Sequence, residues 1–331
     1  MYRFQKILTS CCLAMFLGAS SAAALAAEDE RRANLWVDLY QGEPVRYENV
    51  LDDLAGVRVI YLGECHALES HHKIQNAILR DLARKDVSLV LALEQMEHVH
   101  QPHLDRYNVG EIDFKRLAEL TKWPERWGNY KQYEPILKTA RRFQIPVLAL
   151  NARSETIRQV ARKGGVEKLE PELRKELPKE LQLIDPPYEK LLNLQLMVHM
   201  AFTAERLRPI REAQICRDEM MASVLSSFLE SKQGKDRTAI VLCGAGHISF
   251  GLGTPTRVRR RIPDLKDRVI LLSQSGDLEL SPEELAQARE IEITHDQLRE
   301  INRPIADYLH VRALARQNNT QGHDKEGTED E

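Results

Sequence analysis

Short apolar runs alternate with helical patterns along most of the chain. Each run is rich in Val, Ile and Leu and ends at Gly or a polar residue, which is typical of buried strands. Near-continuous apolar strands separated by helical segments predict an α/β fold, with a largely parallel sheet covered by helices on both faces. The runs are residues 57–62, 87–93, 145–150, 238–243 and 269–272.

The segment between the third and fourth runs, about residues 152–235, has a helical pattern throughout. Its first part is charged and contains several prolines. Two helices follow, at about 188–207 and 210–230, and we expect Pro209 to divide them. An insertion of this kind predicts a helical cap over one end of the sheet.

The N-terminus has the parts of a secretory signal peptide. Arg3 and Lys6 precede a run of apolar and small residues, and Ala24-Leu25-Ala26 supplies a cleavage site of the A-x-A type. We therefore expect residues 1–26 to be removed and the protein to be exported. A lipoprotein box ending at Cys11 is the second interpretation, because too few apolar residues precede it; lipidation would add membrane association.

The rest of the chain divides simply. Residues 27–316 are expected to form one α/β domain that carries the cap. Residues 317–331 lack apolar side chains and are predicted to be disordered. A formal net charge of -3, from 47 basic and 50 acidic residues, gives no basic excess and so argues against a nucleic-acid partner. The remaining cysteines, at 65, 216 and 243, are too few for a disulfide framework.

Polar side chains follow the predicted strands where ligands bind in parallel sheets, beyond the carboxyl ends. Two of these strand ends repeat the pattern Gly-x-x-His, in Gly63 to His66 and in Gly244 to His247, while Asn151 ends the third run. Such a cluster could hold a divalent metal, or a His beside a carboxylate could act as a general base. The candidate catalytic residues are Glu64, His66, Glu94 and His247, and the candidate metal ligands are His66, Glu94, His247 and His72.

Further candidates lie on the helical segments. On the second cap helix, Gln214, Arg217 and the adjacent Asp218 interrupt an apolar stripe, so they either line the site or form an internal ion pair. Arg217 would suit a carboxylate-bearing ligand. An aromatic stretch from 123 to 133 is either local packing or a wall for a planar ligand. In the cap, His199 lies between Met197 and Met200 with Tyr188 upstream, and Met, His and Tyr can all be axial ligands of haem iron.

Several motifs together resemble the ChaN haem-binding uptake family, which is grouped with Tiki and TraB proteins and erythromycin esterases. They are GECH (63–66) with the following HH (71–72), LALEQM (91–96), WGNY (127–130), LALN (148–151) and CGAGH (243–247). The resemblance extends over about residues 45–312. The chain departs from the family pattern at Ala67, where an Asp usually follows the His.

The resemblance implies an envelope protein, periplasmic or associated with the outer membrane, that binds haem for iron uptake as a homodimer. An outer-membrane haem receptor would be a partner. The family's tyrosine ligand could correspond to Tyr130, Tyr133 or Tyr188, and Arg217 could meet a haem propionate. The related Tiki and esterase branches imply instead metal-dependent or His-assisted hydrolysis at His66, Glu94 and His247. Whether the protein is an enzyme stays open at this point.

Overall fold

The computed structural model describes residues 34–199, 204–274 and 303–312, and side chains at 195–206 are not described. The predicted signal peptide, the lipidation cysteine and the predicted disordered tail lie outside the described residues, as does the side chain of His199. Within the described part of the chain, no helix is long and apolar enough to cross a membrane.

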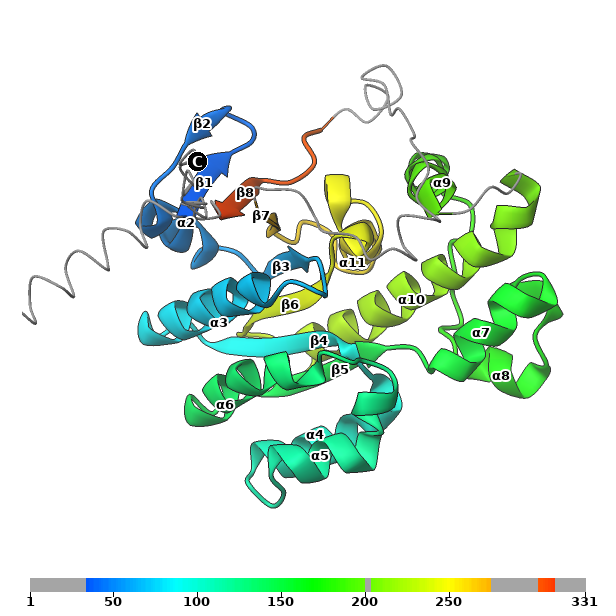
Figure 1. The fold of residues 1–331 in the computed structure, drawn as a ribbon, viewed down its shortest axis with the longest axis horizontal. Helices are drawn as coiled ribbons and strands as arrows, with labels where there is room; N and C mark the ends of the chain where they lie inside the picture. The colour runs from blue at the N-terminus through cyan, green and yellow to red at the C-terminus, as the bar shows by residue number, and fades with distance from the viewer. Residues whose placement is uncertain (1–33, 200–203, 275–302, 313–331) are drawn as a thin grey trace, which may run out of the picture.

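The core is one mixed sheet of eight strands in the order β2-β1-β8-β7-β3-β6-β4-β5 (Figure 1). Neighbours from β8 to β5 pair in parallel, and β1 and β2 add an antiparallel edge. All five predicted strands are present, so the predicted α/β class and largely parallel sheet are confirmed. The strands are β1 (Asn34–Asp38), β2 (Glu43–Pro44), β3 (Val59–Glu64), β4 (Leu89–Glu97), β5 (Val147–Asn151), β6 (Thr238–Gly244), β7 (Asp267–Gln274) and β8 (Tyr308–Arg312).

Helices cover both faces of this sheet. On one face, alternate strand residues such as Leu62 and Leu242 pack against α2, α3 and α6. On the other, Tyr61 and Val241 pack against the C-terminal half of α10 and against α11. The helices on these faces are α2 (Tyr47–Leu54), α3 (Glu69–Arg84), α4 (Gln101–Asn108), α5 (Phe114–Thr121), α6 (Glu134–Arg142), α10 (Ala204–Glu230) and α11 (Thr254–Arg261).

The predicted cap region contains α7, α8 and α9, which gather around the N-terminal half of α10 (Figure 1). Its boundaries differ from the prediction: α10 runs through Pro209 instead of beginning after it. Pro209 lies in the second turn, so the missing N–H costs one intrahelical hydrogen bond close to the helix start. The cap helices are α7 (Ser154–Lys163), α8 (Pro171–Lys175) and α9 (Pro186–His199).

The strand order explains where ligand-capable residues meet. From β3 the chain crosses by α3 to β4, and it returns from β5 to β6 through α10 on the opposite face. β6 therefore lies between β3 and β4, and the carboxyl ends of these three strands adjoin at the centre of the sheet. Open parallel sheets bind ligands at such a position. Two short 3-10 turns directly follow these strands, η1 (His98–His100) after β4 and η5 (Ala245–His247) after β6. The other 3-10 turns are η2 (Trp123–Glu125), η3 (Tyr130–Tyr133), η4 (Val166–Lys168) and η6 (Ser249–Gly251).

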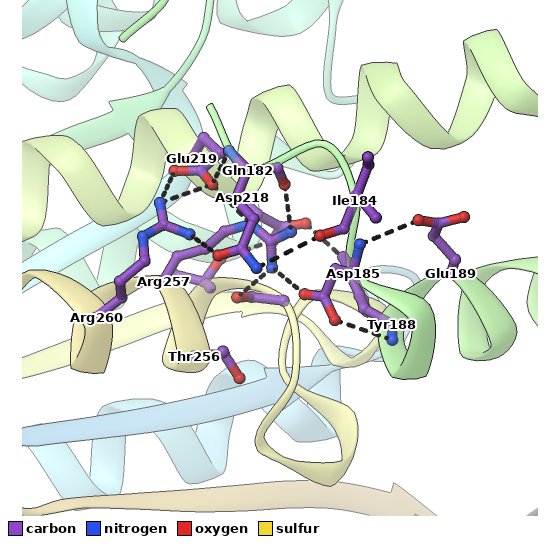
Figure 2. A network of polar contacts seen from close by, with 12 residues as sticks. Gln182, Ile184, Asp185, Tyr188, Glu189, Asp218, Glu219, Thr256, Arg257 and Arg260 are labelled. Atoms are coloured by element: carbon purple, nitrogen blue, oxygen red, sulfur yellow. Dashed lines mark hydrogen bonds and ion pairs between the residues drawn. The ribbon is translucent and has the colours of Figure 1, made fainter. Parts of the chain in front are cut away.

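A buried charge network ties the cap to the sheet domain (Figure 2). Arg257 of α11 is fully buried; it lies 3.3 Å from a carboxylate oxygen of Asp185 and 3.3 Å from one of Glu219. Its guanidinium also covers the ring of Tyr188 at 5.0 Å. Glu219 is buried too and receives Arg260 at 2.7 Å. The loop before α9, α9 itself and α10 thus all contact the Arg257 cation of α11.

Candidate functional site

Glu64, the last residue of β3, is a buried carboxylate surrounded by hydrogen-bond donors. Its oxygens lie 2.7 Å from Nδ1 of His66 and accept from the amide of Gln75 at 2.6 Å. Burial alone would raise the pKa of Glu64, but the surrounding hydrogen bonds lower it to about 2. The carboxylate is therefore ionised at neutral pH. The side chains around it are His66, His72, Gln75, Gln95 and Tyr133.

His66 lies just beyond the strand end, with 38 % of its side chain exposed. The Glu64 carboxylate fixes Nδ1, and Trp127 packs edge-on against the ring at 4.7 Å. Burial opposes a charge on the ring, yet the hydrogen bond to Glu64 and the charge of Glu94 raise the pKa of His66. Its Nε2 approaches Gly244 so closely that a Cβ there would lie 2.8 Å away. Because Nδ1 holds Glu64, Nε2 is the ring atom left for chemistry.

His247 is buried between two carboxylates from different elements. Nε2 lies 3.1 Å from Glu94 of β4, and Nδ1 lies 2.8 Å from Asp218 of α10. Burial would lower the pKa of His247, but the charges of Glu94 and Asp218 raise it to about 10. The ring is therefore an imidazolium near neutral pH. In that state it cannot accept a proton, so the two Gly-x-x-His histidines differ in chemistry.

Glu94 is held on its other side by backbone. Its Oε2 accepts the Gly244 N–H at 2.7 Å, and its own carbonyl accepts from the Asn151 amide at 3.0 Å. Burial opposes ionisation of Glu94, but the charge and hydrogen bond of His247 lower its pKa to about 2. The ends of β4, β5 and β6 are thus joined through one carboxyl residue, as the strand-end pattern predicted.

The residues from α10 also reach this site. The Gln214 amide lies 3.1 Å from both ring nitrogens of His247, and Arg217 donates to Asn151 at 3.1 Å. Asp218 accepts from the Tyr188 hydroxyl at 2.7 Å and from Thr254 at 2.7 Å as well as contacting His247. The structure thus pairs Asp218 with His247 and brings Gln214 and Arg217 against the strand-end residues His247 and Asn151.

The predicted divalent metal finds no support. Among the described residues, no group of three or more His, Cys, Asp or Glu side chains is arranged to hold a metal ion. His72 is turned toward Glu64, at 3.4 Å, and toward the Tyr133 ring. Both nitrogens of His247 are taken by carboxylates. The cluster is instead a set of charge-assisted hydrogen bonds.

Two of the tyrosines considered for haem are committed to carboxylates. The Tyr133 hydroxyl donates to Glu64 and that of Tyr188 to Asp218, and both side chains are buried. Tyr130 is half-buried and its ring stacks on Phe114 at 5.9 Å. The neighbouring Trp123 is buried against Tyr130 and Tyr133, so much of the aromatic stretch is packing.

Some site residues were not among the candidates. Gln95 donates to Glu64 at 2.9 Å although Glu94, its neighbour on β4, serves His247. Strict alternation would turn adjacent strand residues to opposite faces. The pairing register of β4 with β5 shifts between Leu93 and Glu97, and alternation does not hold across it. Cys65, which lies between Glu64 and His66 in the sequence, is an exposed free thiol, whereas Cys216 and Cys243 are buried.

Chemically, the arrangement is a pair of carboxylate–histidine units with opposite roles. Glu64 orients His66 with one ring nitrogen unbound to a carboxylate, which suits a proton acceptor. Glu94 and Asp218 hold His247 as a cation near neutral pH with both ring nitrogens occupied, so His247 neutralises and positions these two carboxylates and does not accept a proton. Both units lie at the carboxyl ends of parallel strands in an α/β fold.

Comparison with known proteins identifies the family. A family model described as haem-binding uptake, Tiki superfamily, ChaN matches residues 50–258, which is more than half of the chain. The chain therefore belongs to the ChaN haem-binding uptake family, as the motifs predicted. The match ends inside α11, so it includes the cap and both Gly-x-x-His segments.

The fold agrees with this assignment. The structure of ChaN of Campylobacter jejuni with cofacial haem is similar, with a TM-score of 0.61 and 19 % identity; the match covers 84 % of this chain and 96 % of that one. An erythromycin esterase in its open conformation is more distant, with a TM-score of 0.42 and 11 % identity over 72 % of this chain and 77 % of that one.

A plant protein is also related by sequence. The chloroplastic protein RETICULATA-RELATED 5 of Arabidopsis thaliana is 24 % identical over 259 residues, which is 70 % of this chain and 34 % of that protein. The chain thus spans about a third of the length of this relative.

Proposed function

We propose that this protein binds haem in the bacterial envelope and serves haem or iron uptake. The observation that carries the proposal is the match of residues 50–258 to the haem-binding uptake family. The similarity to a ChaN structure that holds cofacial haem supports the same ligand, and cofacial packing would bring two copies of the chain together. The N-terminal signal-like segment supports export.

The described residues limit where haem would sit. The pocket at the strand ends has a volume of about 150 Å³. Sites for drug-sized ligands have about 300–1,000 Å³, so the macrocycle does not fit inside it. The haem macrocycle would therefore lie outside this pocket, and a second copy of the chain would supply further burial.

Of the three candidate tyrosines, Tyr130 fits an iron ligand best. Tyr133 and Tyr188 would have to give up buried hydrogen bonds to Glu64 and Asp218, which costs about 1.5–3 kcal/mol for a bond to a charged group. Tyr130 is only half-buried, and its hydroxyl makes no hydrogen bond to the described part of the chain. Bound haem would supply ferric iron, for which a phenolate oxygen is a suitable ligand.

The test is a haemin titration of the chain from Ala27 onward, followed by visible absorption. We expect saturable binding with a tyrosinate spectrum that Tyr130→Phe abolishes and that Tyr40→Phe, at an exposed tyrosine, leaves intact. A His66→Ala/His247→Ala double variant should still bind. Absence of saturable binding by the parent would refute the haem proposal. Loss in the double variant, with folding intact, would move the haem to the strand ends.

A second function, hydrolysis of an ester or amide, is favoured by the Glu64–His66 pair. His66 Nε2 would take a proton from water while the water oxygen bonds to the carbonyl carbon. It would return that proton to the leaving alcohol or amine as the ester C–O or amide C–N bond breaks. A screen of chromogenic esters without added metal tests this. Hydrolysis that is retained in Gly128→Ala, where a Cβ meets nothing within 4 Å, and lost in His66→Ala would support it.

A further inference from the structure

A small pocket opens beside the strand-end cluster, between the end of the sheet and the aromatic turn after α5. Its volume of about 150 Å³ is that of a cavity known to accept one benzene, or about six heavy atoms. Its lining includes Trp123 and Trp127, two of the three tryptophans of the chain. Its polar lining includes Glu94, Asn151, Ser154 and Arg217. The pocket is thus sized for a small chemical group.

The carboxylates that line the pocket are already satisfied. Glu97 pairs with Arg126 at 2.6 Å and accepts the Ser154 N–H at 2.9 Å. Glu94 is bound by His247 and by the Gly244 N–H. Neither carboxylate is therefore in need of a cation from a ligand.

Arg217 is in the opposite situation. A guanidinium has five N–H donors, and in the described residues Arg217 makes one recorded hydrogen bond, to the neutral oxygen of Asn151 at 3.1 Å. The charges of Glu94, Glu97 and Asp218 act on Arg217, but among the described residues it forms no ion pair with any of them. Burial lowers the pKa of Arg217, but arginine remains charged at neutral pH. The pocket therefore contains a half-buried cation with donors to spare.

We propose that this pocket binds the carboxylate of a small organic anion, with Arg217 as its partner. A guanidinium binds a carboxylate through two parallel N–H···O hydrogen bonds. The hydrogen bond from Arg217 to Asn151 would hold the guanidinium in place. The volume limits the buried part to a chain about as long as propionate. Two sources have this chemistry: a free small organic acid, or a propionate arm of haem whose macrocycle stays outside.

Binding of a free acid in this pocket does not depend on the proposed haem function, whereas binding of a haem propionate rests on it. Tryptophan fluorescence and calorimetry would be followed while the chain from Ala27 onward is titrated with propionate, with succinate and with uncharged propionamide. In parallel, haemin would be compared with haemin dimethyl ester. The variants are Arg217→Gln and Arg217→Lys, with the exposed Arg116→Gln as the matched control.

If the source is a free acid, we expect saturable binding of the acids, at least about tenfold weaker binding of propionamide, and a loss of about ten- to a hundredfold in Arg217→Gln. If the source is haem, the acids bind negligibly and haemin binds at least about tenfold tighter than its ester, a difference that disappears in Arg217→Gln. Arg116→Gln should match the parent in both cases.

The proposal is overturned if acids and amide bind alike, or if Arg217→Gln, with its unfolding transition intact, binds as the parent does. It is also overturned if neither free acids nor the ester comparison shows a carboxylate preference. Equal binding of haemin and its ester, together with no preference for the acids over propionamide, would leave the haem function standing without this pocket. Acid binding without haemin binding would do the reverse.

Discussion

Nε2 of His66 lies so close to Gly244 that a Cβ built on residue 244 would be only 2.8 Å from it. Gly244 has φ -61° and ψ 142°, which any residue adopts, so glycine is required here for space and not for backbone conformation. Gly244→Ala should therefore fold and push the His66 ring away from Glu64. We expect the pKa of His66 to fall toward 6.5, at a stability cost of about 1 kcal/mol for the lost hydrogen bond.

NMR titration of the histidines would measure this shift. Gly128→Ala, whose Cβ meets nothing within 4 Å, is the matched control and should leave the pKa of His66 unchanged. A His66 pKa in Gly244→Ala equal to that of the parent would contradict the steric argument.

Asp218→Asn removes one of the two carboxylates that keep His247 protonated. We expect the pKa of His247 to fall from about 10 and the free energy of unfolding to drop by about 3–5 kcal/mol, since a buried charge pair is broken. In the parent, the stability from His247 is fully present below about pH 6.5 and is lost as the pH rises through about 10.

In the variant this alkaline loss should be smaller and should be complete at a lower pH. Urea denaturation at several pH values between 6 and 10 measures it. Glu155→Gln, which affects only exposed or half-buried contacts with Arg158 and Gln159, should change stability by less than about 0.5 kcal/mol. An alkaline profile identical to that of the parent would show that Asp218 does not control His247.

His310 of β8 is buried, and burial and the charge of His71 lower its pKa to about 4. The unfolded chain binds a proton below pH 6.5 that the folded ring does not bind until about pH 4, so stability is lost as the pH falls through this window. His310→Gln should make the acid profile shallower by up to about 1.4 kcal/mol per pH unit. Asn34→Ala removes the partner of His310 but not the titrating ring. It should lower stability and keep the parent slope in chemical denaturation; equal slopes for all three proteins would be evidence against this role of His310.

Arg257→Met should destabilise the protein by about 3–5 kcal/mol, because the buried carboxylates of Asp185 and Glu219 lose their ion pairs with Arg257. Arg260→Met is the natural comparison: the same Glu219 is involved, but Arg260 is 33 % exposed and the effect should be about 1 kcal/mol. Urea unfolding monitors stability, and limited proteolysis monitors release of the loop at 176–185. Equal effects of the two substitutions would mean that burial of Arg257 has no special consequence.

The central strands could be predicted because each is buried on both faces and therefore nearly all apolar in sequence. The edge strands could not. In β1 only Trp36 is buried, and β8 has the mixed sequence YLHVR, so neither shows the continuous apolar run. Their place in the sheet depends on pairing between residues 34–38 and 308–312, which are distant in sequence.

The location of the site was predictable for a related reason. Parallel strands bring their carboxyl ends to one edge, so Glu64, Glu94 and His247 had to meet. Which His pairs with which carboxylate was not predictable from spacing, because Asp218 arrives on α10 from the other face. The continuity of α10 past Pro209 was predicted wrongly, because a proline signal was given more weight than its position near a helix start.

The helix α10 serves the cap and the core with the same turns. Asp218 contacts His247, and only one turn later Met221 and Ala222 pack on the sheet, followed by Leu225. A rigid helix cannot rotate one of these turns without the other. A hydrophobic substitution at Leu225 that shifts the helix should therefore alter the proton affinity of His247, although Leu225 does not contact that ring. In this protein the hydrophobic packing of α10 on the sheet and the charge of the buried His247 ring are mechanically coupled.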